Sequence, residues 1–138
     1  MRYLLDTHTF LWYFWDSKDL GESASEIIEN NAVEKYVSIA SLWEFSIKYS
    51  MGKLTFEGGL THLWEMLSKN GFIILPITQP QLETLIAELS LHHRDPFDRL
   101  IIATAKAEDM TIVTIDENIH KYEDCFCQGG NLYSMSST

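Results

Sequence analysis

Arg2-Tyr3-Leu4-Leu5-Asp6 opens the chain with a short run of large, mostly apolar side chains that ends at an acid. The same pattern returns late in the chain, where the apolar run Thr111–Ile115 is followed by Asp116. Tyr36–Ile39 and Phe72–Leu75 are two further runs of this kind. Short apolar runs without polar alternation are typical of strands that are buried on both faces of a sheet. The sequence therefore predicts four such strands, and a weak fifth at Asn131–Ser134.

Longer stretches with apolar residues at helical spacing separate these strands. Pro96–Glu108 has the clearest helical pattern, because Pro96 fits the first helical position and Asp95 the N-cap before it. The other predicted helices are Thr7–Trp15, Ala24–Asn31, Ala40–Tyr49, Leu60–Lys69 and Gln79–Leu89. Alternation of strands and helices predicts an α/β domain whose parallel sheet is covered on both faces. The chain has 138 residues, a typical length for one domain, so residues 1–138 are expected to form a single domain.

Composition restricts the function before any motif is considered. No apolar run approaches the length of a membrane span, and Asp6 comes too early for a secretory signal, so a cytoplasmic protein is expected. The formal net charge is −10, and an acidic protein does not attract a phosphate backbone through its overall field. Metal ions held by acids, or a basic partner on the acidic surface, could reverse that argument.

Three other features have structural explanations that we favour over functional ones. Cys125 and Cys127 are too close for a typical disulfide and too few for a zinc site. His92-His93 are adjacent and do not share one face of a helix, so surface or loop positions are expected. The aromatic run Phe10–Trp15 could stack nucleic-acid bases, but a role in the core or in a partner interface is favoured.

Four acids are predicted to meet at one edge of the sheet. Asp6 and Asp116 directly follow the first and fourth strands, and Glu44 lies about one turn into the helix after the second. Asp98, with Asp95 three residues before it, opens the helix that leads into the fourth strand. A right-handed crossover places the start of that helix at the carboxyl edge as well. Ligands bind at this edge where the strand order reverses, so a functional site is expected there.

Metal binding and helix capping are both compatible with these acids. Carboxylates packed together resist ionisation, a divalent cation relieves this, and oxygen ligands suit Mg²⁺ or Mn²⁺. However, Ser41-Leu42-Trp43-Glu44 also fits a capping box, and Asp6 and Asp116 could be N-caps after their strands. Asp95 is favoured as the N-cap of its helix. For the other acids, the spacing alone leaves both interpretations open.

Basic residues lie close to these acids in the sequence. Lys48 is one turn beyond Glu44 on the same helical face, Lys53 follows the helix, and Arg94 and Arg99 bracket the acidic pair. They could contact substrate phosphates. They could equally form ion pairs, of which Glu44 with Lys48 would contribute only a few tenths of a kcal/mol.

These motifs run in order over nearly the whole chain. They are Tyr3-Leu4-Leu5-Asp6-Thr7-His8, Ser38-Ile39-Ala40-Ser41-Leu42-Trp43-Glu44 with Lys48 and Gly52-Lys53-Leu54, Asp95-Pro96-Phe97-Asp98-Arg99-Leu100-Ile101-Ile102-Ala103, and Val113-Thr114-Ile115-Asp116. With them, the sequence resembles the PIN-domain ribonucleases, and in particular the VapC-type toxins of type II toxin–antitoxin systems.

The resemblance implies a three-layer α/β/α PIN-like domain with a central, mainly parallel sheet of four or five strands. It also implies a Mg²⁺- or Mn²⁺-dependent endoribonuclease, usually a homodimer, that is inhibited by an antitoxin protein encoded beside it. The RNA is then cleaved by metal-assisted hydrolysis. Neither the RNA target nor the number of metal ions follows from the sequence.

Motif positions assign the site residues. The family's acidic quartet corresponds to Asp6, Glu44, Asp98 and Asp116. Asp6 and Asp98 are expected to bind the metal directly, Asp116 to bind a second ion or act through water, and Glu44 to position a water or serve as base. Residues expected to contact the substrate or support the site are Thr7, Lys48, Arg99 and Thr114.

Two other functions compete with this one. A receiver-type or other Mg²⁺-dependent phosphoryl-transfer domain would also carry acids at this edge. However, a receiver needs an acid after its third strand, where this chain has Leu75-Pro76-Ile77. The second is a catalytically silent PIN-like binding module, whose acids cap helices and whose aromatic residues bind a protein.

Overall fold

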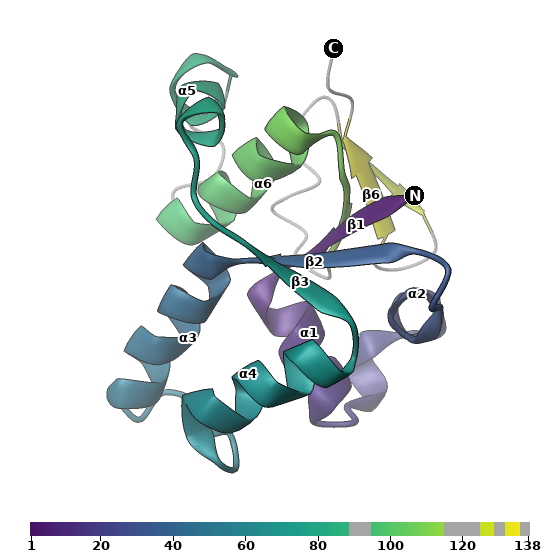
Figure 1. Cartoon of the computed structure of the whole chain (residues 1–138), viewed down its shortest axis with the longest axis vertical. Coiled ribbons are helices and arrows are strands. Elements are labelled where there is room, and N and C mark those ends of the chain that lie inside the picture. The colour runs from purple at the N-terminus through teal and green to yellow at the C-terminus, as the bar shows by residue number, and fades with distance from the viewer. Residues whose placement is uncertain (89–94, 115–124, 129–131, 136–138) are drawn as a thin grey trace.

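The computed structural model describes residues 1–88, 95–114, 125–128 and 132–135 (Figure 1). Its elements, in chain order, are β1 (Arg2–Leu5), α1 (Thr7–Phe14), the short 3₁₀ helix η1 (Lys18–Leu20), α2 (Glu22–Glu29), β2 (Glu34–Ser38), α3 (Ile39–Ser50), α4 (Gly59–Lys69), β3 (Phe72–Leu75), α5 (Gln79–Glu88), α6 (Pro96–Glu108), β4 (Thr111–Val113), β5 (Cys125–Gln128) and β6 (Leu132–Met135). The predicted α/β class is confirmed.

One sheet has the strand order β3-β2-β1-β4-β6-β5. The first four strands of the chain are parallel, whereas β6 pairs antiparallel with both β4 and β5. The chain builds outward from β1 through β2 to β3, and then returns to the other side of β1 with β4. The strand order therefore reverses between β1 and β4, and this is the place where open α/β sheets bind their ligands.

Two hydrophobic cores cover opposite faces of the sheet, because successive side chains of a strand point to opposite sides. Leu5, together with Val37 and Val113, packs into the core that includes α1, α2, α3 and α4. Leu4, together with Tyr36, packs into the core formed with α6. Figure 1 shows α5 and α6 on one side of the sheet and α1, α2 and α4 on the other. The three-layer α/β/α architecture is thus confirmed.

The described sheet has six strands, whereas four or five were expected. The additional strand is β5, and β6 covers Leu132–Met135 in place of the predicted Asn131–Ser134. Cys125–Gln128 and Leu132–Met135 each include a polar residue and are not the continuous apolar runs that identified the other strands, which explains the difference. β2 begins at Glu34, before the predicted Tyr36, and β4 covers Thr111–Val113 of the predicted Thr111–Ile115, whose last residue lies outside the described ranges.

Several element boundaries agree closely with the sequence patterns. β3 and α6 have the predicted limits, and α1, α3, α4 and α5 differ from the prediction by one residue at one or both ends. None of the helices in the described part of the chain combines the length and the apolar character that a membrane-spanning helix needs.

Candidate metal centre

Asp6 lies at the point where the strand order reverses. Its backbone N–H donates to the carbonyl of Val113 at 3.3 Å, which joins the end of β1 to the end of β4. The Thr114 hydroxyl, just after β4, donates to Asp6 Oδ2. The other carboxylate oxygen of Asp6 accepts from the Thr9 backbone N–H at 2.9 Å and from the Thr9 hydroxyl at 2.5 Å. Asp6 is therefore the N-cap of α1, and it is also held at the predicted site.

Only 3% of Asp6 is exposed, and burial raises the pKa of its carboxyl group. The hydrogen bonds from Thr114 and Thr9 and the nearby charge of His8 oppose this shift without cancelling it. Burial disfavours the charged form of a carboxyl group. An adjacent cation would stabilise the ionised carboxylate, so the environment of Asp6 is compatible with a metal ligand.

Glu44 faces inward from α3 toward α1. Its Oε1 accepts from the Thr7 hydroxyl at 2.7 Å, and only 3% of the residue is exposed. The N-cap of α3 is Ser38, whose side chain accepts from the Ala40 N–H at 3.0 Å. The capping-box interpretation of Glu44 is therefore wrong, because the N-cap position belongs to Ser38, three residues before Ser41. Glu44 is therefore a buried acid in the middle of α3, and its carboxylate bonds to Thr7 of α1 instead of capping its own helix.

Lys48 connects Glu44 to the start of α6. Its ammonium lies 2.8 Å from Glu44 Oε2, which is the ion pair that the spacing allowed. Burial acts to lower the pKa of Lys48, but the hydrogen bond and charge of Glu44 and the charges of Asp95 and Asp98 outweigh it, so the pKa is raised. The charges of three acids, Glu44 on α3 and Asp95 and Asp98 at the start of α6, therefore act on Lys48.

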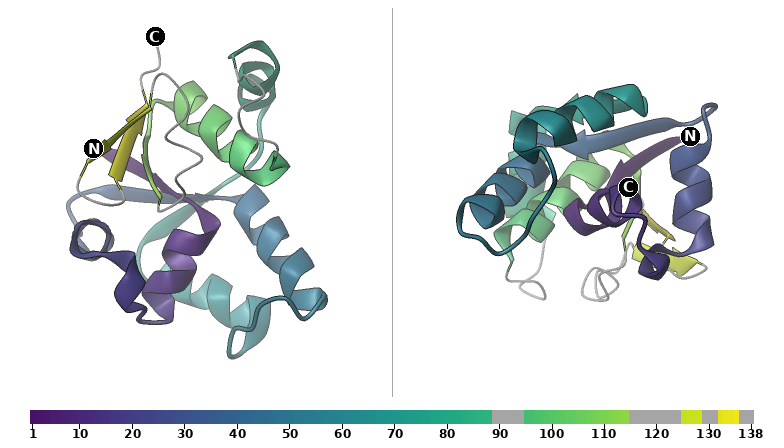
Figure 2. Two further views of the ribbon diagram at one scale, coloured as in Figure 1. Left: turned by 180° about the vertical axis from the view of Figure 1, so that it is seen from behind. Right: turned by 90° about the horizontal axis from the view of Figure 1, so that it is seen from below.

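The start of α6 brings Asp98 beside α3. Asp98 is half-buried in the first turn of α6, and the neighbouring Phe97 packs edge-on against Trp43 of α3 with ring centroids 5.2 Å apart. Seen from behind, α1, α3 and α6 come together at one end of the sheet (Figure 2). Thr7, Glu44, Lys48 and Asp98 therefore lie around the same end of the domain as Asp6.

Asp95 is confirmed as the N-cap of α6. Its Oδ1 accepts from the N–H groups of Phe97 at 2.8 Å and Asp98 at 3.2 Å, and Pro96 occupies the first turn. This contact satisfies two N–H groups that would otherwise lack a partner at the helix start.

Replacing Asp95 by alanine is expected to destabilise the domain by about 1 kcal/mol, because the cap is lost. Asp95→Asn is the matched control, since the amide oxygen can accept the same bonds, and it should remain within a few tenths of a kcal/mol of the wild type. Urea unfolding of the three proteins measures both differences. Equal stability of the alanine variant and the wild type would show that the cap does not stabilise α6.

Some of the other predicted site residues lie outside the part of the chain that the structure describes. Asp116 lies outside the described residues, as do Arg94 and His92-His93. Arg99 is half-buried next to Asp98, and its Nε has no hydrogen-bond partner among the described residues. Within the described ranges, no three His, Cys, Asp or Glu side chains come close enough together to hold a metal ion as a group. The described part of the site is therefore a set of acids linked through Thr7 and Lys48, not a closed cluster.

Thr9 was not predicted as part of the site. It is fully buried, and both its backbone N–H and its hydroxyl donate to Asp6. The available signal was the spacing, since an N-cap aspartate bonds the residue three positions later. Together with Thr114, Thr9 fixes the orientation of the Asp6 carboxylate.

The PIN domain model matches residues 3–124, and the chain therefore belongs to the PIN-domain family. Its fold is similar to a chain in the crystal structure of VapBC2 from Rickettsia felis bound to a DNA fragment from their promoter, with TM-score 0.68, 18% identity, and coverage of 89% of this chain and 94% of that one. It is also similar to a chain of a toxin–antitoxin complex from Klebsiella pneumoniae, with TM-score 0.59, 20% identity, and coverage of 86% and 88%. No curated protein sequence matches the chain significantly.

Proposed function

We propose that the chain is a Mg²⁺- or Mn²⁺-dependent endoribonuclease and the VapC-type toxin of a toxin–antitoxin pair. The observation that carries the proposal is the buried Asp6 carboxylate, which Thr9 and Thr114 hold at the reversal of strand order in a PIN domain. The similarity of the fold to chains of toxin–antitoxin complexes supports the same function. The proposed partners are RNA as substrate and an antitoxin as inhibitor.

The residues of the site fit a hard divalent ion. The donors around Asp6 and Glu44 are carboxylate and hydroxyl oxygens, which Mg²⁺ and Mn²⁺ prefer. In this proposal Asp6 and Asp98 hold the ion, and Asp116 provides further support. A bound ion would neutralise charge on the scissile phosphate and lower the pKa of water.

The remaining residues bind and orient the reactants. Glu44 orients the attacking water or accepts its proton, and the hydroxyl of Thr7 fixes the direction of the Glu44 carboxylate. Lys48 and Arg99 contact phosphate oxygens of the RNA. The Lys48 ammonium is only partly buried, so it can contact a phosphate and keep its bond to Glu44.

The test is cleavage of RNA by the purified, partner-free protein in Mn²⁺. We expect cleavage by the wild type, loss of cleavage in EDTA, and loss of most activity in Asp98→Asn. Asp109→Asn is the matched control, because Asp109 follows the far end of α6. Metal binding without RNA cleavage would instead favour a catalytically silent PIN-like binding module. The absence of both metal binding and cleavage would favour the same alternative.

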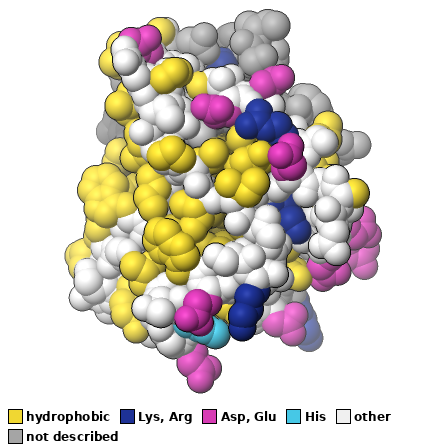
Figure 3. Space-filling view, viewed as in Figure 1, with side chains coloured by type: hydrophobic (Ala, Val, Ile, Leu, Met, Phe, Trp, Pro, Cys, Tyr) yellow, Lys and Arg dark blue, Asp and Glu magenta, His cyan; other side chains and the backbone are white. Residues whose placement is uncertain are grey.

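We also propose that the protein is a homodimer that pairs through an apolar face. Trp43 on α3, Ile73 on β3, Ile77, and Leu82 and Ile86 on α5 are all exposed hydrophobic residues, and 82% of Ile86 is accessible. Figure 3 shows hydrophobic side chains gathered over this face, with charged groups mainly around its border. An exposed apolar patch with a polar rim is typical of an interface.

Ile86→Lys is expected to convert the dimer into a monomer, because each copy would place a charge in the apolar contact. Met51→Lys is the matched control, since Met51 is also exposed but follows the far end of α3. Light scattering in solution measures the mass of all three proteins. A wild-type monomer, or an Ile86→Lys protein that stays dimeric, would contradict the proposed interface.

A further inference from the structure

Lys35 is a charged side chain that projects into a mostly apolar layer. Successive residues of β2 point to opposite faces of the sheet, so Lys35 shares a face with Val37, which packs into the core that includes α1, α2 and α4. Only 3% of Lys35 is exposed. It stands near the amino end of β2, whereas the candidate metal centre lies at the carboxyl edge of the sheet. Lys35 is therefore a buried cation that the candidate metal centre does not use.

The Lys35 ammonium has few partners. Its Nζ donates to the Ile28 carbonyl at 2.6 Å and lies 5.6 Å from the centre of the Phe72 ring. An ammonium group has three N–H donors, so two of them have no oxygen or nitrogen acceptor in the described part of the chain. No acid of the described ranges forms an ion pair with Lys35. Buried lysines are normally paired, and burial lowers the pKa of Lys35, so an anion beside Nζ would stabilise its charged form.

A cavity of about 330 Å³ lies beside this amine, and we call it the Lys35 pocket. Lys69, from the end of α4, lines the pocket together with Lys35, and so do Asn31 and Asn70. Lys69 is exposed and, like Lys35, forms no ion pair within the described residues. Two amines that have no carboxylate partner in this part of the structure therefore line one cavity.

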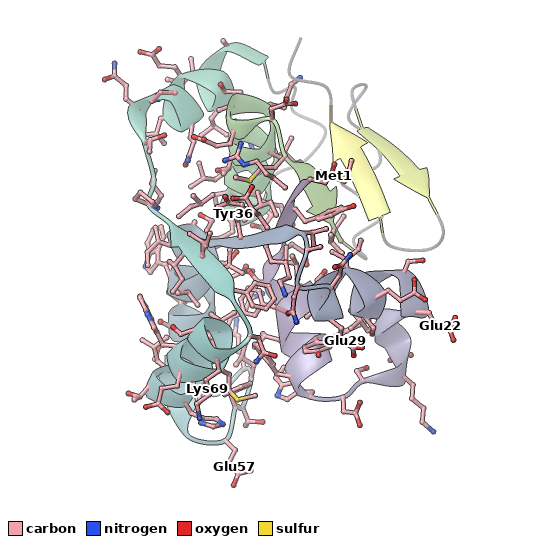
Figure 4. The ribbon with its side chains drawn as sticks, turned by 45° about the vertical axis from the view of Figure 1, so that its right-hand side comes forward. Met1, Glu22, Glu29, Tyr36, Glu57 and Lys69 are labelled. Atoms are coloured by element: carbon pink, nitrogen blue, oxygen red, sulfur yellow. The ribbon has the colours of Figure 1, made fainter. Side chains whose placement is uncertain are left out.

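Glu29 is the acid among the described lining residues of the pocket. It is exposed on α2, and its Oε1 accepts from the Tyr13 hydroxyl at 3.5 Å. Burial and the charge of Glu29 raise the pKa of Tyr13, which keeps this hydroxyl protonated. Figure 4 shows Glu29 between Glu22 of the same helix and Lys69. Glu29 thus bonds to Tyr13 and to neither amine, and its charge weakens the binding of an anion in the pocket.

We infer that the Lys35 pocket binds a phosphate group between Lys35 and Lys69. A phosphate carries about −1.5 to −2 charges near pH 7 and has several acceptor oxygens, which matches two ammonium groups with unused N–H donors. Lysine is a common ligand of phosphate. A carboxylate carries a single charge and would compensate only one of the amines. This inference goes beyond the proposed function and does not rest on it.

The test is calorimetric titration of the full chain with inorganic phosphate, at low salt and in EDTA, so that no metal-bound phosphate contributes. The wild type should bind phosphate, and acetate should bind at least about tenfold more weakly. Adenosine 5′-monophosphate and adenosine distinguish the source of the group, and adenosine should not bind. Tighter binding of the monophosphate than of inorganic phosphate would identify a nucleotide as the ligand. Tighter binding of inorganic phosphate would identify the free anion.

Lys35→Met removes the buried charge and keeps a long side chain. Phosphate binding should weaken at least about tenfold, because the phosphate loses a cation and its N–H donors. Without phosphate, the thermal midpoint should stay close to that of the wild type, since removal of an unpaired buried charge offsets the lost bond to Ile28. Lys69→Met should also weaken phosphate binding, and it should fold as the wild type does because Lys69 is exposed. Lys18→Met is the matched control, since Lys18 is exposed on η1 and does not line the pocket.

Glu29→Gln should have the opposite effect on the pocket. The amide removes the negative charge that repels the phosphate, so binding should become severalfold tighter. Glu26→Gln is the matched control, because Glu26 is exposed on the same helix and does not line the Lys35 pocket. It should bind phosphate as the wild type does. Weaker binding of phosphate by Glu29→Gln than by Glu26→Gln would contradict the proposed position of the anion.

No phosphate binding by the wild type would overturn the inference. So would equal binding by the wild type, Lys35→Met and Lys69→Met, or acetate that binds as tightly as phosphate. RNA cleavage in Mn²⁺ is measured separately, and Lys69→Met should cleave as the wild type does because Lys69 lies outside the candidate metal centre. Cleavage by a wild type that does not bind phosphate would refute the pocket and leave the nuclease standing. Phosphate binding without cleavage would refute the nuclease and leave the pocket standing.

Discussion

Asp6→Asn is expected to reduce RNA cleavage at least about a thousandfold, equivalent to about 4 kcal/mol of transition-state stabilisation. The reason is that the amide keeps the shape of the side chain and removes the negative charge that holds the divalent ion. Initial rates at saturating Mn²⁺ measure the effect.

The fold of Asp6→Asn should be preserved. The amide oxygen can still accept from the Thr9 N–H, and asparagine is as good an N-cap as aspartate. Burial raises the pKa of Asp6, so a neutral amide also avoids the cost of a buried charge. In EDTA, the thermal midpoint should therefore be equal to or above that of the wild type.

Asp19→Asn is the matched control for activity, because Asp19 is an exposed acid in η1. It should cleave as the wild type does. An Asp6→Asn protein that is folded and fully active would refute the assignment of Asp6. A folded, inactive variant with an intact Asp19→Asn control would support it.

Phe45→Ala is expected to cost about 3–5 kcal/mol of unfolding free energy, the range for large aromatic residues in a core. Phe45 is fully buried on α3, stacks on Tyr49 at 5.5 Å and meets Phe56 edge-on at 6.0 Å. The free energy of unfolding of a domain is only about 5–15 kcal/mol in total, so this loss would be a large part of it. Because α3 also carries Glu44, the variant should lose the hydrogen bond between Thr7 and Glu44 when the temperature is raised.

Urea unfolding measures this loss. Met51→Ala is the matched control, because the side chain is exposed at the end of the same helix, and its change should stay within about 0.5 kcal/mol. A loss below about 1.5 kcal/mol for Phe45→Ala would mean that the core can collapse around the missing ring.

Much of the fold follows from local sequence patterns. Arg2–Leu5, Phe72–Leu75 and Pro96–Glu108 form the predicted strands and helix with the predicted limits. The two strands are short, mostly apolar runs, and the helix has apolar residues at helical spacing after an N-cap. The parallel sheet follows from the alternation of these elements. β5 could not be predicted, because its pairing with β6 depends on contacts that four residues do not encode.

The candidate site, like the fold, could be predicted from the sequence only in part. The sequence placed Asp6 at the sheet edge and Asp95 at a helix start, since both positions follow from chain order. The capping-box interpretation of Ser41 and Glu44 is wrong, because the N-cap of α3 is Ser38 and the Glu44 carboxylate accepts from the Thr7 hydroxyl. The spacing of an N-cap indicates the bond from the Thr9 N–H to Asp6, but it does not show that the Thr9 hydroxyl bonds to the same oxygen.

The most direct test of a carboxylate metal centre is calorimetric titration of the partner-free protein with Mn²⁺. The wild type should bind the ion, whereas Asp6→Asn and Asp98→Asn should each bind at least about tenfold more weakly, a change of about 1.4 kcal/mol. The Asp19→Asn control should bind as the wild type does. No Mn²⁺ binding by the wild type, or equal binding by all four proteins, would contradict the metal centre.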